Sequence, residues 1–186
     1  MEYPKWAQEM EPAGKAKRSA QGTRNRAAGN QFEAMIDAAC EWYKAAGAAV
    51  IDKTPEPMRP ISKPNRAGQF MACYTKQAQP DYKGTLADGH AIVFEAKHTD
   101  DERITFDRLT VEQRRQLEAY SNMRAFAFVL VSVGLQNFYA VPWNFWRDMK
   151  RIYGRKYMNL HDLERFRVPV YKGMVDFLMW TEGETR

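Results

Sequence analysis

A short run near the middle of the chain combines apolar residues with an acid and a base. Ile92, Val93 and Phe94 come directly before Glu95, and Lys97 follows two residues later. Lys-Gly at 83–84 and Asp-Gly at 88–89 are turn-forming pairs, so we expect a hairpin whose second strand spans residues 90–97. Side chains alternate across a strand, which places Glu95 and Lys97 on one face. Charges on so apolar a strand are expected to be buried and to need a partner such as a metal.

The segment Gln79-Pro80-Asp81-Tyr82, just before this hairpin, supplies a second acid. Phosphodiester hydrolysis needs a hard cation that neutralises the scissile phosphate and lowers the pKa of an attacking water, and magnesium prefers carboxylate oxygens with water completing its shell. Asp81 and Glu95 are therefore candidate Mg²⁺ ligands, and Lys97 is a candidate for stabilising charge in the transition state. The alternative is a surface strand on which Glu95 and Lys97 form an ordinary salt bridge.

Two residues on predicted helices could join this site. Gln113 shares a face with Leu117 on a helix expected over residues 110–123, so its amide oxygen could complete the metal shell. Equally, Thr110 and Gln113 have the spacing of a capping box. Glu33, on a helix expected to begin near Asn30, is a third carboxylate that could act in catalysis if that helix crosses the sheet, and otherwise it is a solvated helix residue.

The composition narrows the class of protein. A chain of 186 residues suits one domain, and its 28 lysines and arginines against 23 acids give a formal charge of +5, compatible with a polyanionic partner. Two cysteines and three histidines are too few and too scattered for a disulfide framework, a zinc site or a histidine-metal site. The sequence has no phosphate-binding loop, bilayer-spanning run or signal peptide. We therefore expect a soluble, cytoplasmic protein that binds no nucleotide cofactor and does not associate with a membrane.

Two basic segments stand apart from the predicted core. Residues 1–28 lack apolar periodicity and are expected to form a flexible basic arm, or a solvated tail without a partner. Residues 54–79 contain four prolines, which forbid regular helix or central strand, and we expect a protruding stalk that contacts DNA. The alternative is a flexible surface insertion. The cations of the stalk that we expect to bind DNA are Arg59, Lys63, Arg66 and Lys76.

The remaining pattern predicts a mixed α/β domain over residues 29–186. Short apolar runs predict strands at 48–51, 126–133 and 138–141, and Pro142 opens a further helix. With the hairpin, these strands give a central sheet of about four or five strands with helices on both faces.

From about residue 29 to residue 141 the chain resembles the PD-(D/E)xK nuclease superfamily, and within it the RecU-type Holliday junction resolvases. The resemblance implies a restriction-endonuclease-like fold and a homodimer that binds four-way junctions, with the insertion engaging the junction centre as a stalk. It also implies two opposed, symmetric nicks made with Mg²⁺ or Mn²⁺. Carried over, Asp81, Glu95 and Gln113 would be metal ligands, and Lys97 would act on the transition state. It rests on Gly29-Asn30-Gln31-Phe32-Glu33, Ala49 to Pro55, Lys76-Gln77-Ala78, Asp81-Tyr82-Lys83-Gly84, Phe94-Glu95-Ala96-Lys97 and Gln113.

One departure weakens the proposed ligand set. The family has a threonine two residues before the aspartate, and Gln79 stands there instead. The function we expect is junction resolution in DNA recombination and repair. The alternatives are another endonuclease of the same superfamily, of the restriction or repair type, and a non-catalytic DNA-binding recombination accessory protein.

Overall fold

A mixed six-stranded sheet forms the centre of the protein, for which a computed structural model describes residues 11–55, 57–75 and 79–180. β5 and β7 run parallel, and the other neighbouring strands pair antiparallel. The predicted α/β fold with a mixed sheet is confirmed, with more strands than expected because residues after 160 add an edge strand. In spatial order the strands are β1 (Ala49–Lys53), β4 (Tyr82–Leu86), β5 (Ala91–Thr99), β7 (Phe126–Val133), β8 (Asn137–Pro142) and β10 (Arg167–Val168).

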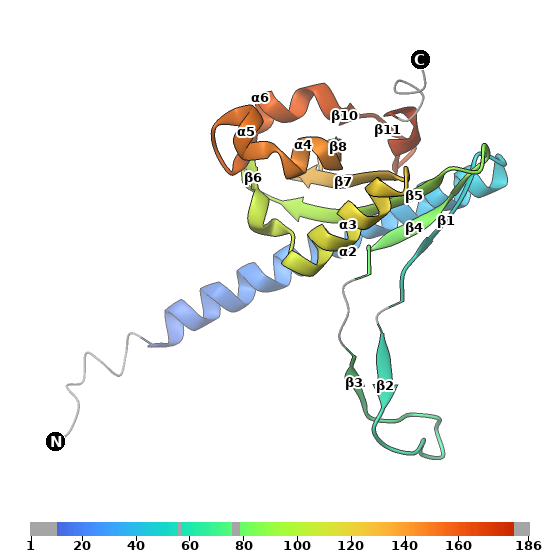
Figure 1. Cartoon of the computed structure of the whole chain (residues 1–186). Helices are drawn as coiled ribbons and strands as arrows, with labels where there is room; N and C mark the ends of the chain where they lie inside the picture. Colours follow the sequence, from blue (N-terminus) through green and yellow to red (C-terminus); the bar gives the residue numbers. More distant parts are fainter. Residues whose placement is uncertain (1–10, 56, 76–78, 181–186) are drawn as a thin grey trace.

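Helices cover both faces of this sheet (Figure 1). On one face, α2 (Glu11–Ala45) and the 3-10 helix η3 (Phe177–Trp180) pack against Ile92 and Phe94. On the other face, Val93 packs with α3 (Val111–Asn122), α4 (Trp143–Arg147) and α5 (Met149–Tyr153). The predicted alternation along β5 is therefore confirmed. Trp143 and Trp146 belong to this second core, which explains the tryptophan-rich segment as structural.

Helix α2 is much longer than the sequence predicts. The expected start near Asn30 is wrong, because the helix begins at Glu11 and runs for 35 residues. Among residues 22–45 of the helix, the first buried side chain is that of Phe32, so residues 22–31 lack the buried face on which the prediction rested. The first half of the helix is rich in alanine, arginine and lysine, which favour helix without needing a core, and it projects away from the sheet (Figure 1). Of the predicted arm, residues 1–10 lie outside the described residues.

The proline-rich insertion forms a separate antiparallel ribbon of β2 (Met58–Pro60) and β3 (Ala72–Tyr74). The ribbon projects from the sheet as a stalk (Figure 1). Its turn is built around Asn65, whose side-chain oxygen accepts hydrogen bonds from the Ala67 and Gln69 amides, each at 2.9 Å. Gly68 adopts a φ of 77°, a left-handed backbone conformation that residues with a Cβ atom rarely adopt. The stalk is therefore a defined ribbon and not an irregular loop.

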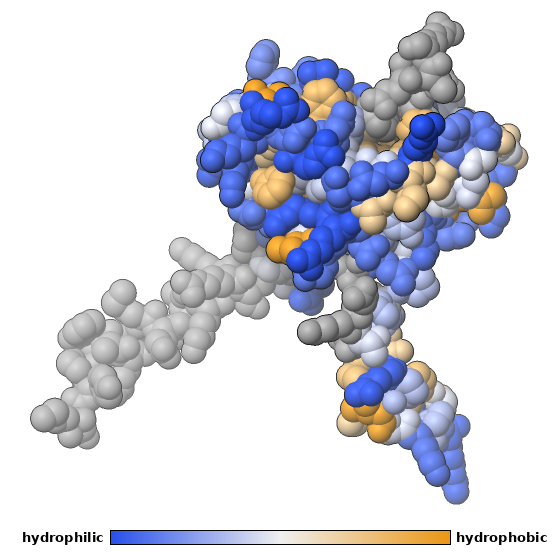
Figure 2. Space-filling view, viewed as in Figure 1, coloured by the Kyte–Doolittle hydropathy of each residue, from blue (hydrophilic) through white to orange (hydrophobic). Residues whose placement is uncertain are grey.

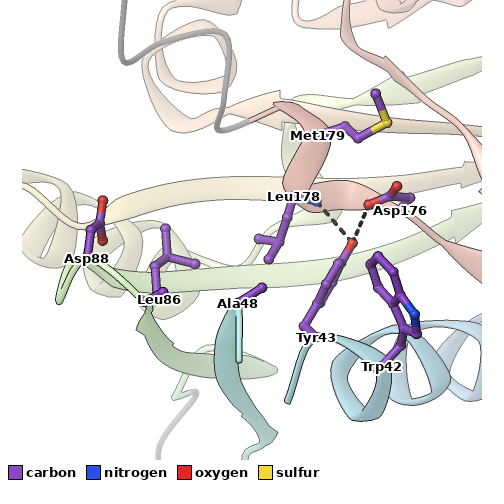
Figure 3. Close-up of a pocket in the computed structure, with 9 residues that line it drawn as sticks. Trp42, Tyr43, Ala48, Leu86, Asp88, Asp176, Leu178 and Met179 are labelled. Atoms are coloured by element: carbon purple, nitrogen blue, oxygen red, sulfur yellow. Dashed lines mark hydrogen bonds between the residues drawn. The ribbon is translucent and has the colours of Figure 1, made fainter. Parts of the chain in front are cut away.

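Short elements complete the fold. Tyr43 on α2 donates a 2.7 Å hydrogen bond to Asp176 and accepts one of 3.1 Å from the Leu178 amide, fastening the last described segment to the helix (Figure 3). Within the part of the chain that the structure describes, no helix is long and apolar enough to cross a membrane. The remaining elements are the two-stranded pairs β6 (Arg103–Thr105) with β9 (Tyr157–Asn159) and β11 (Val170–Tyr171) with β12 (Met174–Val175), and η1 (Phe106–Arg108), α6 (Leu160–Leu163) and η2 (Glu164–Phe166).

Candidate active site

The strand pairing brings the predicted acids and lysine together. Tyr82 on β4 pairs with Phe94 on β5, so Asp81, one residue before β4, lies beside Glu95 and Lys97. The Lys97 Nζ atom is 3.1 Å from Asp81 Oδ2 and 2.8 Å from Glu95 Oε2. The same Asp81 oxygen accepts a 3.0 Å hydrogen bond from the Ala96 amide. The backbone of β5 thus fixes the aspartate, and the lysine joins both carboxylates.

The two carboxylates differ in their surroundings. The Glu95 side chain has no exposed surface, and burial raises its pKa to about 8. The Asp81 side chain is 35% exposed. Burial alone would lower the pKa of Lys97, but the charges of Asp81 and Glu95 outweigh it and raise that pKa. Lys97 therefore remains a cation at neutral pH, and the buried glutamate is held beside it with little access to water.

An unsatisfied oxygen indicates what the cluster lacks. Glu95 Oε1 is buried and has no hydrogen-bond partner in the part of the chain that the structure describes, which is costly for a carboxylate unless another group completes its environment. A divalent cation shared with Asp81 would supply that partner and would favour the ionised form of Glu95. Among the described residues, no group of three or more His, Cys, Asp or Glu side chains is arranged to hold a metal. The donors that fit are thus two carboxylates, an arrangement that leaves room for water and phosphate oxygens.

Gln113 takes part in the predicted capping box and also contacts the candidate site. Its backbone amide donates to Thr110 Oγ1 and its Oε1 accepts from the Thr110 amide, so the capping box exists. Its Nε2 donates to Glu95 Oε2, so the side chain also reaches the site. The amide nitrogen faces the carboxylate while the oxygen is occupied by the cap. In this arrangement Gln113 orients Glu95, and its role as a metal ligand remains a prediction that requires the amide to turn.

Glu33 lies at the margin of the cluster. Its carboxylate forms a 2.7 Å ion pair with Lys53 on β1, and its side chain is 40% exposed. The hydrogen bond to Glu33 is the main cause of the raised pKa of Lys53, and the charge of Asp81 adds to it. Lys53 thus lies within electrostatic reach of both acids. The structure links Glu33 to the site through Lys53, and a catalytic role for Glu33 remains a prediction.

The predicted DNA-binding residues of the stalk are not brought to the cluster. Arg59, Lys63 and Arg66 are exposed on the ribbon, and Lys76 lies outside the described residues. The base of the stalk does adjoin the site, since the Thr54 amide donates a 2.8 Å hydrogen bond to the Asp81 carbonyl. The start of the stalk, where the chain leaves β1, therefore lies beside Asp81. A molecule held by the stalk would reach the carboxylates along this segment.

A hollow of about 440 Å³ next to Lys97 is lined in part by residues to which the sequence assigned no role in the site. Asn25 and Gly29 contribute from the projecting half of α2, and Arg108 contributes from η1. His98, also in the lining, contacts Ser132 and Asp100, each at 3.1 Å, which makes it a largely buried strand-end residue. Gly29 belongs to the motif that opens the family resemblance, whereas Asn25 and Arg108 lie in no motif and are placed there by the path of α2 and by the η1 turn.

The mixed sheet, with two carboxylates and a lysine on adjoining strands, is the arrangement of a PD-(D/E)xK-type α/β protein. The family model described as Recombination protein U (RecU) matches residues 27–182, and the chain belongs to this family. The predicted resemblance to the RecU-type proteins is confirmed.

Two RecU relatives agree with this assignment. A Holliday junction resolvase RecU of Streptococcus sanguinis is 30% identical over 149 residues, which is 76% of this chain and 74% of that protein. A Holliday junction resolvase RecU of Streptococcus oralis is 34% identical over 113 residues, or 58% of this chain and 57% of that protein. The solved structure of Hjc, a Holliday junction resolvase from Archaeoglobus fulgidus, has a TM-score of 0.46 at 13% identity, covering 73% of this chain and 92% of that one.

Proposed function

We propose that this protein is a divalent-metal-dependent endonuclease that resolves Holliday junctions. The observation that carries the proposal is the contact of Lys97 with Asp81 and Glu95, together with the buried Glu95 Oε1 atom, which has no hydrogen-bond partner among the described residues. Membership of the RecU family supports the four-way junction as the substrate. We further propose Mg²⁺ as the cofactor, with Mn²⁺ as a substitute, and a cytoplasmic setting.

Asp81 and Glu95 would hold the cation. When bound, it would neutralise charge on the scissile phosphate and lower the pKa of the attacking water. The Ala96 amide keeps Asp81 in place, and the Gln113 amide does the same for Glu95. Because both acids are fixed before substrate arrives, little reorganisation is required during the reaction.

Lys97 would act on the phosphate itself. Its raised pKa keeps the side chain charged, and its Nζ already lies within 3.1 Å of both carboxylates. A phosphate oxygen entering between the acids would therefore meet a cationic donor. Such a donor stabilises the charge that builds on the equatorial oxygens in the transition state.

Substrate recognition would rest on the stalk and on symmetry. The exposed Arg59, Lys63 and Arg66, together with Lys76, would contact the phosphates near the junction centre. Two opposed nicks require two sites related by a two-fold axis, so we propose a homodimer.

The decisive experiment compares nicking with binding. Asp81→Asn and Glu95→Gln keep the shape of each side chain but remove its charge, so Mg²⁺-dependent nicking of a mobile four-way junction should fall by roughly a thousandfold or more. Junction binding without metal should change by less than about threefold, since the stalk is untouched.

Asp88→Asn is the matched control, because Asp88 lies in the turn at the opposite end of the β4–β5 hairpin and faces His90. Its nicking rate should equal that of the unaltered protein. Normal nicking by either site variant would refute the proposed site. Equal cleavage of linear duplex and junction would refute the proposed substrate and would favour a general endonuclease of the same superfamily.

A further inference from the structure

A second basic surface lies away from the stalk, around β6 and β9. Between Met149 and Asn159 the chain carries four cations and no carboxylate. These residues span α5 and enter β9, which pairs with β6. The cations are Lys150, Arg151, Arg155 and Lys156.

The β6–β9 pair has one buried and one exposed face. Ile104 and Met158 lie opposite each other and are buried in the second core. Arg103 and Lys156 are exposed, and the Phe106 amide extends the pairing by a 2.9 Å hydrogen bond to the Lys156 carbonyl. The cations are thus carried on backbone that the core holds in place, unlike those of the stalk.

Aromatic rings hold several of these cations. The Tyr157 ring has the Arg103 guanidinium 5.4 Å and the Arg155 guanidinium 4.8 Å from its centroid. The Phe106 ring has Arg114 at 4.6 Å and Lys156 Nζ at 6.0 Å. Such contacts reduce the freedom of long side chains without neutralising them. The positive charges therefore remain available to a ligand.

Neighbouring acids neutralise only some of this charge. Arg155 pairs with Asp162, and Arg114 lies 3.5 Å from Asp107. Over residues 11–55, 57–75 and 79–180, no ion pair is found for Arg103, Lys156 or Arg115. The acids nearest in sequence are those of the bend at 100–102, where Asp100 contacts His98. Arg151 also forms an ion pair, with Asp148 at 2.7 Å, and the exposed Asp101 and Glu102 directly precede Arg103 in the sequence. The charge available to a ligand is therefore mainly that of Arg103, Lys156 and Arg115.

The surface adjoins the candidate active site. Arg108, at the end of η1, lines the same hollow as Lys97 and donates a 2.7 Å hydrogen bond to the His98 carbonyl. Figure 1 places β6 just beyond the tip of the β5 arrow, with α5 next to it, and Figure 2 shows mainly hydrophilic residues over that end of the molecule. A DNA strand at Lys97 would thus have this surface beside it.

We propose that the β6–β9 surface, made of Arg103, Phe106, Arg155, Lys156 and Tyr157, binds the sugar–phosphate backbone of a duplex arm flanking the cleaved strand. This inference rests on the proposed function, since it takes DNA to be the substrate at Lys97. The contacts would be electrostatic and independent of sequence, because the surface offers cations and few groups suited to reading base edges. It would fix the arm, while the stalk would contact the junction centre.

The double variant R103Q/K156Q in the full chain tests the proposal. Binding to a labelled four-way junction is measured in EDTA over a range of salt concentrations. The slope of log K against log salt should become less steep by about 0.9 for each phosphate contact removed, or by roughly 2 in all. Mg²⁺-dependent nicking at saturating junction should stay within about twofold of the unaltered protein, because the cluster at Asp81 is unchanged.

Lys172→Gln is the matched control, since Lys172 lies 5.1 Å over the Tyr171 ring on the β11–β12 turn. Its salt slope should match that of the unaltered protein. An unchanged slope in R103Q/K156Q, or an equal loss in the control, would overturn the proposal. Thermal melting verifies folding, and R103E/K156E, which retains the backbone pairing, should weaken binding further.

The two proposals fail in different ways. If the unaltered protein neither prefers nor nicks junctions, the proposed function is wrong. The salt slope on linear duplex then still decides whether Arg103 and Lys156 contact phosphate.

Discussion

Two antiparallel ribbons that follow each other in sequence, the stalk and the β4–β5 ribbon, differ in how far their side chains are buried. In the β4–β5 ribbon, the Tyr82 and Phe94 rings stack at 4.8 Å between centroids and both are buried. In the stalk, Phe70 is 52% exposed and Met71 is 66% exposed. Both ribbons have paired backbones, so pairing alone does not explain the difference. Packing of the side chains against α2 and η3 makes the first ribbon part of the core.

The difference matches the work proposed for each ribbon. Burial around β5 is what shifts the pKa of Glu95 and holds its carboxylate in place beside Lys97. The stalk depends on its own hydrogen bonds, because a lone two-stranded ribbon is only marginally stable. In the proposed function, a rigid ribbon would carry the chemistry, and a weakly supported one would carry cations that adapt to DNA.

Thiol labelling offers the largest expected contrast between the core and the stalk. Burial, with a smaller contribution from the charge of Asp37, raises the pKa of Cys40 in α2 from 9.0 to about 12. At pH 8 this leaves roughly a thousandfold less thiolate than an ordinary thiol, in addition to steric protection. Cys73 lies half-buried on the stalk. We expect a maleimide to modify Cys73 within minutes and Cys40 only after unfolding, as followed by peptide mass spectrometry.

The same shift has a defined sign for stability. The Cys40 pKa is higher in the folded state, so its contribution to the free energy of unfolding is complete below pH 9 and is lost as the pH rises towards 12. Cys40→Ser should remove this loss, while Cys73→Ser serves as the control. Rapid labelling of Cys40 at pH 8 would contradict its placement in the core.

Phe94→Ala tests the rigid ribbon directly. Phe94 is fully buried and its ring lies 4.7 Å from Phe128 and 5.0 Å from Phe177. Its truncation should lower the free energy of unfolding by about 3–5 kcal/mol, measured by urea denaturation. A loss below about 1 kcal/mol would show that this core tolerates the cavity and that the contrast between the ribbons is wrong.

Much of this organisation follows from local patterns. Alternation along β5 and the capping box at Thr110 were predictable, because each depends on neighbours within a few residues. The start of α2 was missed because the sequence of its first residues has no apolar periodicity. The β6–β9 pair was missed because its strands are short and distant in sequence. Sequence patterns are least able to predict the pairing of strands that lie far apart in the chain.

The candidate site divides in the same way. Asp81, Glu95 and Lys97 were predictable from one hairpin and the chemistry of its side chains. The ion pair between Glu33 and Lys53 depends on how α2 crosses β1, which no local motif specifies. The orientation of the Gln113 amide likewise depends on the cap and on Glu95 together.

The smallest expected effect comes from the stalk. Phe70→Ala should change the free energy of unfolding by less than about 0.5 kcal/mol, because the side chain is half exposed and the described residues give it no place in either core. Phe94→Ala, measured in the same urea titration, is the control that shows what a buried phenylalanine contributes. A loss of more than about 1 kcal/mol at Phe70 that grows with protein concentration would mean that the stalk packs against a second copy. The stalk would then be a structural element of the dimer as well as a DNA contact.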